Sequence, residues 1–202
     1  VVNLISGTIS KHGRLDYVVN NAGGQFRALF EHISLNGWNA VTGLNLTGTY
    51  LMCREAYKQY MKANGGAIVN ILIDFTRGFP GNSHSGAARA GVDNLTKTLA
   101  VEWAPAGVRI NSVAPVSVIY TDTAAALYGE ESVKSNIPRI PLKRLGTPEE
   151  ISTAVCFLLS PSAAYITGET IKVDGGISFY MTQGYEVPGN VKIVKENSIG
   201  EK

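Results

Sequence analysis

The chain contains 202 residues, of which 45% are hydrophobic and 17% are charged. These proportions are typical of one soluble globular domain with a substantial core, and they argue against a disordered chain or a coiled coil. The net charge of +2 supplies no basic stripe, so we expect no nucleic-acid partner.

Signals for membrane insertion and targeting are scarce. No stretch of about eighteen apolar residues is available to span a membrane, and the N-terminus lacks the basic start of a signal peptide. Cys53 and Cys156 lie in apolar helical patterns without metal-ligand spacing, so we expect reduced core thiols in an intracellular protein and no metal site. The C-terminal Gly-Glu-Lys is not a peroxisomal signal of the Ser-Lys-Leu type.

Apolar residues alternate between helical and strand spacing along the chain. We expect helices over residues 1–9, 35–61, 84–103 and 147–159, and strands over residues 15–20, 67–73, 108–114 and 169–173. Residues 116–146 have weak periodicity and two short expected helices, 123–128 and 131–136, which is typical of a lid or binding loop. The alternation predicts one α/β domain with a parallel sheet over residues 1–187, followed by a polar tail, 188–202.

A run of small and turn-forming residues directly follows the first expected strand. It reads Asn20-Asn21-Ala22-Gly23-Gly24, and we refer to residues 20–24 as the glycine loop. Such a loop lets the backbone leave the sheet abruptly and approach a bound molecule closely. Because open α/β sheets bind ligands beyond the carboxyl ends of their strands, the glycine loop is a candidate ligand site.

The expected helix at 84–103 carries a polar stripe. Ser85, Arg89, Asp93 and Lys97 recur every four residues and therefore share one face. A hydroxyl four residues before a cation is the pattern of an acid whose proton release is assisted by a nearby positive charge. The alternative is a solvated face on which Asp93 forms ion pairs with Arg89 and Lys97. The neighbouring His84 is expected to cap the helix or to face solvent.

Asn45 is a polar side chain on the expected helix at 35–61, whose apolar pattern is interrupted at 45–48. Since that helix should be buried, Asn45 needs a hydrogen-bond partner. The glycine loop after a strand, Asn45 on the next helix and Val-Asp-Gly-Gly at 173–176 together resemble the short-chain dehydrogenase/reductase family over about 15–176. The resemblance implies a doubly wound Rossmann-like parallel sheet and a nicotinamide cofactor.

Within that family, several segments are similar to the peroxisomal trans-2-enoyl-CoA reductases. These segments are residues 25–26, 45–49, 84–92, 158–161 and 185–188. The similarity implies NADPH-dependent reduction of the double bond of a trans-2-enoyl-CoA during fatty-acid chain elongation, with an acyl-CoA substrate and a peroxisomal location. It also implies cofactor-binding roles for Asn20, Asn21, Ala22, Gly23, Pro115, Ile119 and Thr121, and catalytic roles for Asn45 and Lys97. The chemistry of the reaction adds Ser85, Arg89 and Tyr120 as catalytic candidates.

The chain departs from the family at its N-terminus. The family's opening strand, its glycine-rich dinucleotide turn and the two strands after it have no counterpart before Val1, so the chain resembles an N-terminally truncated fold. Without that turn we expect weak binding of NADPH, because the pyrophosphate loses its helix N-terminus. The strand at 15–20 would then be an exposed edge, from which we expect homo-oligomerisation, association with a partner chain or poor solubility.

The chain also departs from the family in the polar stripe. Ser85 and Arg89 stand where the broad family has tyrosine and lysine, and Asp93 stands where the resembling reductases have tyrosine. An enoyl reduction needs hydrogen-bond donors at the enolate oxygen more than it needs a phenol. Because Asp93 lies about 12 Å of helical rise beyond Ser85, we expect the Ser85 end to carry the chemistry. Tyr120 or water is then the candidate proton source.

Two alternatives to this function remain. The first is a catalytically silent chain that keeps the fold and assembles with related subunits through its last strand and long helices. The second is a carbonyl reductase, which the missing phenol disfavours.

Overall fold

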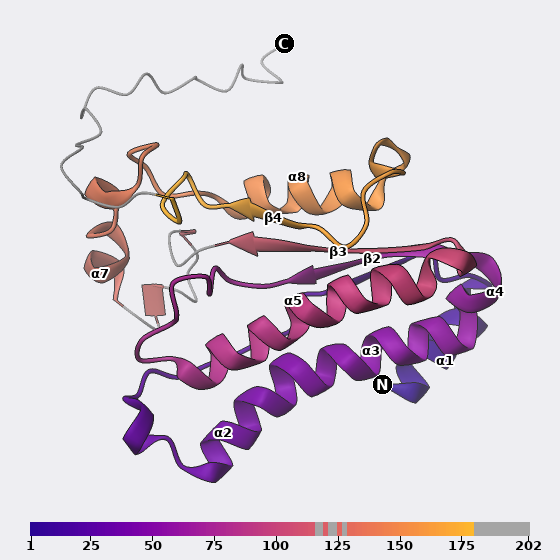
Figure 1. Ribbon diagram of the computed structural model, residues 1–202, viewed down its shortest axis with the longest axis horizontal. Coiled ribbons are helices and arrows are strands. Elements are labelled where there is room, and N and C mark those ends of the chain that lie inside the picture. The colour runs from indigo at the N-terminus through magenta and orange to yellow at the C-terminus, as the bar shows by residue number, and fades with distance from the viewer. Residues whose placement is uncertain (116–118, 121–124, 127–128, 180–202) are drawn as a thin grey trace.

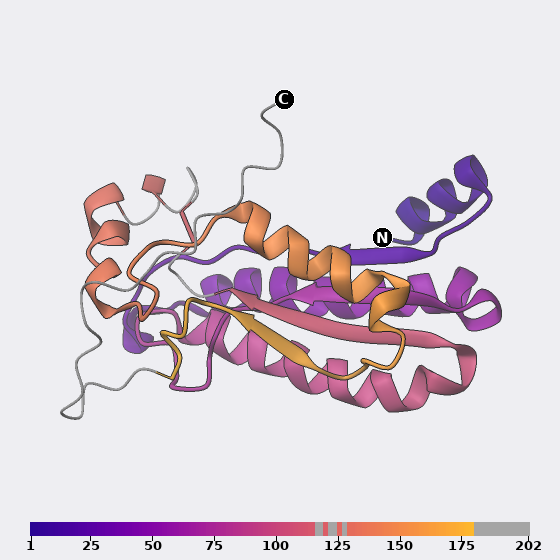
Figure 2. The same ribbon diagram turned by 90° about the horizontal axis from the view of Figure 1, so that it is seen from above.

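The computed structural model describes residues 1–115, 119–120, 125–126 and 129–179. Its four strands form one parallel sheet in chain order, which is β1 (Tyr17–Asn20), β2 (Gly66–Ile71), β3 (Val108–Pro115) and β4 (Thr170–Val173). Helices cover both faces of this sheet, as Figures 1 and 2 show. The expected Rossmann-like α/β architecture is therefore confirmed.

One face of the sheet is covered by α1, by a long helical rod and by α5. The helix α1 (Val2–His12) ends at Gly13, which adopts a φ of 72°. The rod is continuous and comprises α2 (Leu35–Thr42), η2 (Gly43–Thr47), α3 (Gly48–Ala56), η3 (Tyr57–Met61) and α4 (Lys62–Asn64). The expected interruption at 45–48 is a π-helical turn within the rod, not the end of a helix. The helix α5 (Ser83–Trp103) continues into η4 (Ala104–Ala106).

The opposite face is covered by α8 (Pro148–Leu159), which is followed by η6 (Pro161–Ala163). The expected cap is present: the hydroxyl of Thr147 accepts from the Glu150 backbone N–H, and the Glu150 carboxylate accepts from the Thr147 N–H. The short elements are η1 (Phe30–His32), α7 (Glu130–Lys134) and η5 (Ile137–Arg139). Figure 1 shows α7 beyond the carboxyl ends of the strands. The expected helix at 123–128 lies largely outside the described residues.

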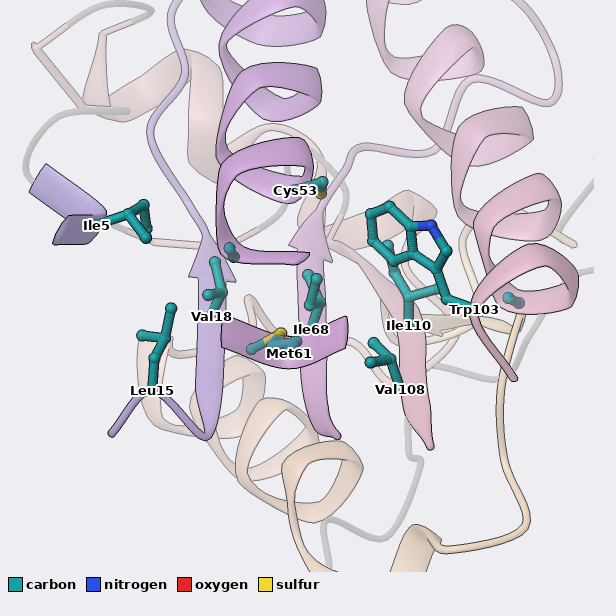
Figure 3. Close-up of a cluster of buried hydrophobic side chains, with 11 residues drawn as sticks. Ile5, Leu15, Val18, Cys53, Met61, Ile68, Trp103, Val108 and Ile110 are labelled. Atoms are coloured by element: carbon teal, nitrogen blue, oxygen red, sulfur yellow. The ribbon is translucent and has the colours of Figure 1, made fainter. Parts of the chain in front are cut away.

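Three apolar clusters among the described residues hold the layers together, and the two largest lie on opposite faces of the sheet. The larger cluster joins α1, α3 and α5 to the strands (Figure 3) and contains Ile5, Leu15, Val18, Cys53, Ala56, Met61, Ile68, Ala100, Trp103, Val108 and Ile110. The second cluster, under α8, contains Val69, Val113, Val155, Leu158 and Ala163. Successive residues of one strand join opposite clusters because side chains alternate across a sheet.

The two cysteines differ in their surroundings. Cys53 is buried as expected, and this burial raises the pKa of its thiol to about 12. Cys156 is exposed, so the expectation of a core thiol was wrong at this position. The reason is the helical period of α8: Val155 and Leu158 face the sheet, while Cys156 falls on the outer side of the helix.

The strand β1 forms an edge of the sheet among the described strands. Tyr17 is 53% exposed and Val19 is 43% exposed, whereas Val18 and Asn20 are buried. Association of another chain with this edge stays a prediction, as does the tail at 188–202, which lies outside the described residues. Within the part of the chain that the structure describes, no helix is long and apolar enough to cross a membrane.

Candidate active site

The first two turns of α5 carry buried polar side chains at the carboxyl ends of the strands. Ser85 is fully buried, and Arg89 is only 7% exposed. Arg89 Nη1 donates to the backbone carbonyl of Ile71, at the end of β2, over 2.6 Å. The alternative of a solvated face is therefore wrong for these two residues, because the helix turns them towards the sheet.

Arg89 is a buried cation with few partners. Among the described residues, no carboxylate forms an ion pair with its guanidinium, and its Nε has no hydrogen-bond acceptor. Burial lowers the pKa of the Arg89 guanidinium from its ordinary value, which is that of a strong base. Arginine nevertheless stays charged in proteins, so this side chain places an unneutralised positive charge beside the end of β2.

The glycine loop packs directly on this cation. A Cβ atom added to Gly23 would lie 2.1 Å from Nη2 of Arg89 and 3.1 Å from Oδ1 of Asn45, so only glycine fits there. On their other side, Asn21, Ala22 and Gly23 are exposed. The glycine loop therefore presents one side to solvent and the other side to Arg89 and Asn45.

Asn45 fixes the conformation of the glycine loop. It is fully buried on the π-helical turn of the rod, and its amide forms two hydrogen bonds of 2.9 Å with the backbone N–H and C=O of Gly24. The sequence predicted that this buried amide needs a hydrogen-bond partner. The structure identifies this partner as Gly24 of the glycine loop, and the catalytic role expected for Asn45 stays a prediction.

Ser85 has a side-chain partner that its own helix does not supply. Its hydroxyl donates to Oε1 of Gln25 over 2.7 Å. Gln25 was noted only within a resembling segment, and no local pattern links it to Ser85, sixty residues away. His84 is fully buried against the edge of Phe26, with ring centroids 4.5 Å apart. His84 therefore does not face solvent, but its Nδ1 accepts from the Ser85 backbone N–H in the first turn of α5 over 2.9 Å, so the expected capping contact is present.

Asn20 contributes its side chain to the core. It is 7% exposed, and its Nδ2 donates to Oδ1 of Asn70 over 2.7 Å. Asn70 donates in turn to Thr96, which is 3.0 Å from the hydroxyl of Ser112. Asn20, Asn70 and Ser112 occupy matching positions on β1, β2 and β3. Because Asn20 points inwards on its strand, its expected contact with cofactor is limited to its backbone.

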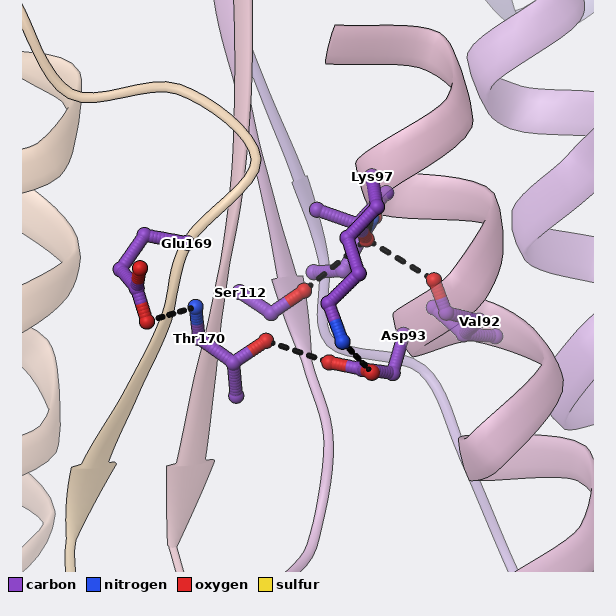
Figure 4. Close-up of polar contacts among 8 residues, drawn as sticks. Val92, Asp93, Lys97, Ser112, Glu169 and Thr170 are labelled. Atoms are coloured by element: carbon purple, nitrogen blue, oxygen red, sulfur yellow. Dashed lines mark hydrogen bonds and ion pairs between the residues drawn. The ribbon is translucent and has the colours of Figure 1, made fainter.

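The distal part of the polar stripe forms a separate cluster. Asp93 accepts from the hydroxyl of Thr170 on β4 over 2.6 Å and pairs with the ammonium of Lys97, as Figure 4 shows. The side chain of Lys97 is 59% exposed. Lys97 lies twelve residues, or about 18 Å of helical rise, beyond Ser85. The structure therefore does not bring the expected catalytic Lys97 to Ser85.

The remaining expected site residues follow β3. Pro115 ends the strand and is half-buried. Ile119 forms a bridge with Gly146, and the Tyr120 N–H donates to the Gly146 carbonyl over 3.0 Å. No hydrogen bond within the described residues joins the Tyr120 phenol to Ser85. Thr121 lies outside the described residues.

A parallel sheet covered by helices on both faces, with a glycine loop at its carboxyl edge, is an α/β architecture of the Rossmann class. The family model described as enoyl-(acyl carrier protein) reductase matches residues 1–178. The chain belongs to the short-chain dehydrogenase/reductase family.

Relatives from bacteria and yeast have sequences similar to this chain. A probable 2,4-dienoyl-CoA reductase of Bacillus subtilis is 40% identical, with 86% of this chain and 70% of the relative covered. A peroxisomal 2,4-dienoyl-CoA reductase of Saccharomyces cerevisiae is 34% identical, with 88% and 61% covered. A 3-oxoacyl-[acyl-carrier-protein] reductase of Synechocystis is 42% identical, with 89% and 72% covered. The chain thus spans 61% to 72% of the length of these relatives.

Solved structures share the fold. A citronellol catabolism dehydrogenase of Pseudomonas aeruginosa has a TM-score of 0.76 at 42% identity, with 88% of this chain and 68% of that chain covered. A putative short-chain alcohol dehydrogenase of Sinorhizobium meliloti has a TM-score of 0.82 at 33% identity, with 89% and 72% covered. The family includes reductases of both carbon–carbon and carbonyl double bonds, so the choice between these reactions must come from the site.

Proposed function

We propose that this chain carries the active site of an NADPH-dependent trans-2-enoyl-CoA reductase of fatty-acid chain elongation. The observation that carries the proposal is the buried, unneutralised guanidinium of Arg89 one helical turn from Ser85. Relatives named 2,4-dienoyl-CoA reductase support a thioester substrate with a conjugated double bond. A peroxisomal location belongs to the same proposal and is supported by the name of the yeast relative.

The proposed reaction places negative charge where this site is positive. Hydride addition to the β-carbon of an enoyl thioester moves an electron pair onto the thioester oxygen, and the enolate then takes a proton at its α-carbon from Tyr120 or from water. Hydrogen-bond donors and a fixed cation stabilise such an oxyanion strongly in a site that excludes water. The Arg89 guanidinium supplies the charge. The Ser85 hydroxyl has one proton, which is bonded to Gln25 Oε1 in this structure, and in the proposed reaction it turns from Gln25 to donate to the thioester oxygen.

Carbonyl reduction requires a proton donor in the site that enoyl reduction does not require at oxygen. The alkoxide formed in that reaction must take a proton directly on oxygen, usually from a group whose pKa is near that of a phenol. The cluster of Gly23, Asn45, Ser85 and Arg89 contains no phenol and no carboxylic acid. We therefore favour the enoyl reaction over the 3-oxoacyl reaction named for the Synechocystis relative.

A nicotinamide cofactor fits the residues at this edge of the sheet. The exposed side of residues 21–23, backed by a cation with an unpartnered Nε, offers close backbone approach to a polar, anionic molecule. In this proposal residues 20–23, Pro115, Ile119 and Thr121 hold the cofactor, whose chemistry is hydride donation. Asn45 maintains the loop conformation that this contact requires.

The test compares three substrates with the full-length protein. We expect NADPH oxidation with a medium-chain trans-2-enoyl-CoA, and much slower oxidation with a 2,4-dienoyl-CoA or a 3-oxoacyl-CoA. Ser85→Ala should lower turnover of the enoyl-CoA at least tenfold, whereas Thr98→Ala, on the exposed side of the same helix, should not. Faster reduction of the 3-oxoacyl-CoA would reverse the assignment. Absence of turnover with all three substrates would favour the catalytically silent chain.

A further inference from the structure

A second feature of the carboxyl edge is a pocket of about 230 Å³. We call it the adjoining pocket, and its lining residues are Arg27, Phe79, Pro80, Asn82, Ser132, Val133, Ser135 and Asn136. Its walls come from the segment after the glycine loop, from the loop before α5 and from the region of α7. A backbone hydrogen bond from the Ala28 N–H to the Gly81 carbonyl, 2.9 Å long, holds the first two walls together.

The adjoining pocket begins next to the candidate active site. Asn82 lies three residues before Ser85, which is about 4.5 Å of helical rise. Arg27 lies two residues after Gln25, the partner of the Ser85 hydroxyl. A molecule whose reacting carbonyl sits at Ser85 therefore extends into the adjoining pocket if it continues past Asn82.

The lining of the pocket is mainly polar, and one buried acceptor in it lacks a donor. Asn82 is 4% exposed, and its Oδ1 has no hydrogen-bond partner within the described residues. Its side chain does not cap α5 either. By contrast, Ser135 and Asn136 already donate to the backbone carbonyl of Ser132. Asn82 therefore supplies a buried acceptor in this wall that a ligand with an N–H or O–H donor would satisfy.

The charge at the rim adds a second constraint. Arg27 is exposed, so its guanidinium can reach a phosphate at the mouth of the pocket. An apolar acyl chain would bury Asn82 without a donor and would leave Arg27 without a role. A polar chain with amide groups that ends in phosphates satisfies both residues, while Phe79 and Val133 contact its methylene groups.

We propose that the adjoining pocket binds the pantetheine arm of the coenzyme A thioester, an inference that rests on the proposed function. The amide nitrogen closest to the sulfur of this arm is separated from it by two carbon atoms. Asn82 Oδ1 accepts a hydrogen bond from an amide N–H of the arm, and Arg27 attracts the phosphates beyond it. The acyl chain leaves the active site in another direction.

Binding of free coenzyme A to the full-length protein, measured by isothermal titration calorimetry, tests this assignment without turnover. Asn82→Leu removes the acceptor, and we expect the affinity for coenzyme A to fall at least fivefold. Arg27→Ala should have an effect of similar size that shrinks at high salt, and Arg27→Lys should restore most of the affinity. Asn39→Leu and Lys62→Ala, both at exposed positions, serve as matched controls.

The outcomes distinguish failure of the pocket assignment from failure of the proposed reaction. Equal affinity in Arg27→Ala and Lys62→Ala would overturn the assignment, and this comparison stands even if Asn82→Leu fails to fold, because Arg27 is exposed. Reduction of enoyl thioesters by a protein that does not bind coenzyme A would overturn the pocket assignment and leave the reaction intact. Weakened coenzyme A binding in both variants, in a protein that reduces no thioester, would support the pocket and refute the proposed reaction.

Discussion

Substitution of Gly23 by alanine tests whether the glycine loop and Arg89 are mutually dependent. The added Cβ would lie 2.1 Å from Nη2 and 3.2 Å from Cζ of Arg89, so the guanidinium must move. Movement breaks the 2.6 Å hydrogen bond from Nη1 to the Ile71 carbonyl. A hydrogen bond to a charged group contributes about 1.5–3 kcal/mol to stability. The φ of Gly23 is not positive, so the cost is steric rather than a matter of backbone strain.

The adjacent glycine provides a matched control. A Cβ on Gly24 would meet only Cδ2 of Leu44, at 3.4 Å, which is an ordinary contact. Both alanines reduce the entropy of the unfolded chain equally, by about 0.4–1 kcal/mol, so that contribution cancels between the variants. Gly23→Ala should therefore unfold with a free energy about 1.5–3 kcal/mol below that of Gly24→Ala.

Urea unfolding followed by circular dichroism measures this difference. A gap smaller than about 0.5 kcal/mol between the two variants would refute the reasoning, because it falls below the contribution of one hydrogen bond. A double-mutant cycle identifies the partner. In an Arg89→Met background, whose side chain can retreat from the loop, Gly23→Ala should cost much less than in the native chain.

Three further predictions concern the core, the α8 cap and the thiols. Thr96→Val should lower the free energy of unfolding by about 1–3 kcal/mol in urea, because buried amide and hydroxyl groups lose their partner. The hydrogen bond with Arg144 holds the pKa of Glu150 below its ordinary value of 4.5. Ionised Glu150 therefore stabilises the fold above pH 4.5, and this stabilisation is lost as the pH falls through the lowered pKa. Iodoacetamide should label Cys156 in the native protein and Cys53 only after unfolding, as peptide mass spectrometry reports.

Each of these three predictions has a control. Thr98→Val, at an exposed position on the same helix, should leave stability unchanged, and equal losses in both threonine variants would contradict the network argument. The stability of Glu150→Gln should approach that of the native protein as pH falls below 4.5, and a gap independent of pH would refute the linkage. Equal labelling rates for the two native thiols would contradict their assigned burial.

The order of helices and strands followed from local patterns. Apolar spacing located the four strands to within two residues at each end, and Thr147 with Glu150 located the start of α8 correctly. These elements depend on side chains close together in sequence, so their signals are visible without a fold. The interruption in the rod was also visible, although its π-helical form was not.

The site was only partly predictable. Spacing placed Ser85 and Arg89 on one helical face, and the glycine loop was expected at a strand end. Residue spacing could not show the hydrogen bond between Ser85 and Gln25 or the one between Asn45 and Gly24, because these partners are sixty and twenty-one residues apart. The burial of His84 was not predictable for the same reason, since Phe26, which packs against it, comes from another loop.

By itself, the sequence therefore determined the α/β alternation, the family and the end of α5 at which polar residues gather. Only the tertiary structure decided which of those residues face inwards and what they contact. In the folded chain Arg89 packs against Gly23 and does not pair with Asp93. Asp93 instead accepts a hydrogen bond from the hydroxyl of Thr170. The physical reason is that periodicity specifies a face of a helix, whereas the partner on that face depends on which distant segment the packed sheet brings there.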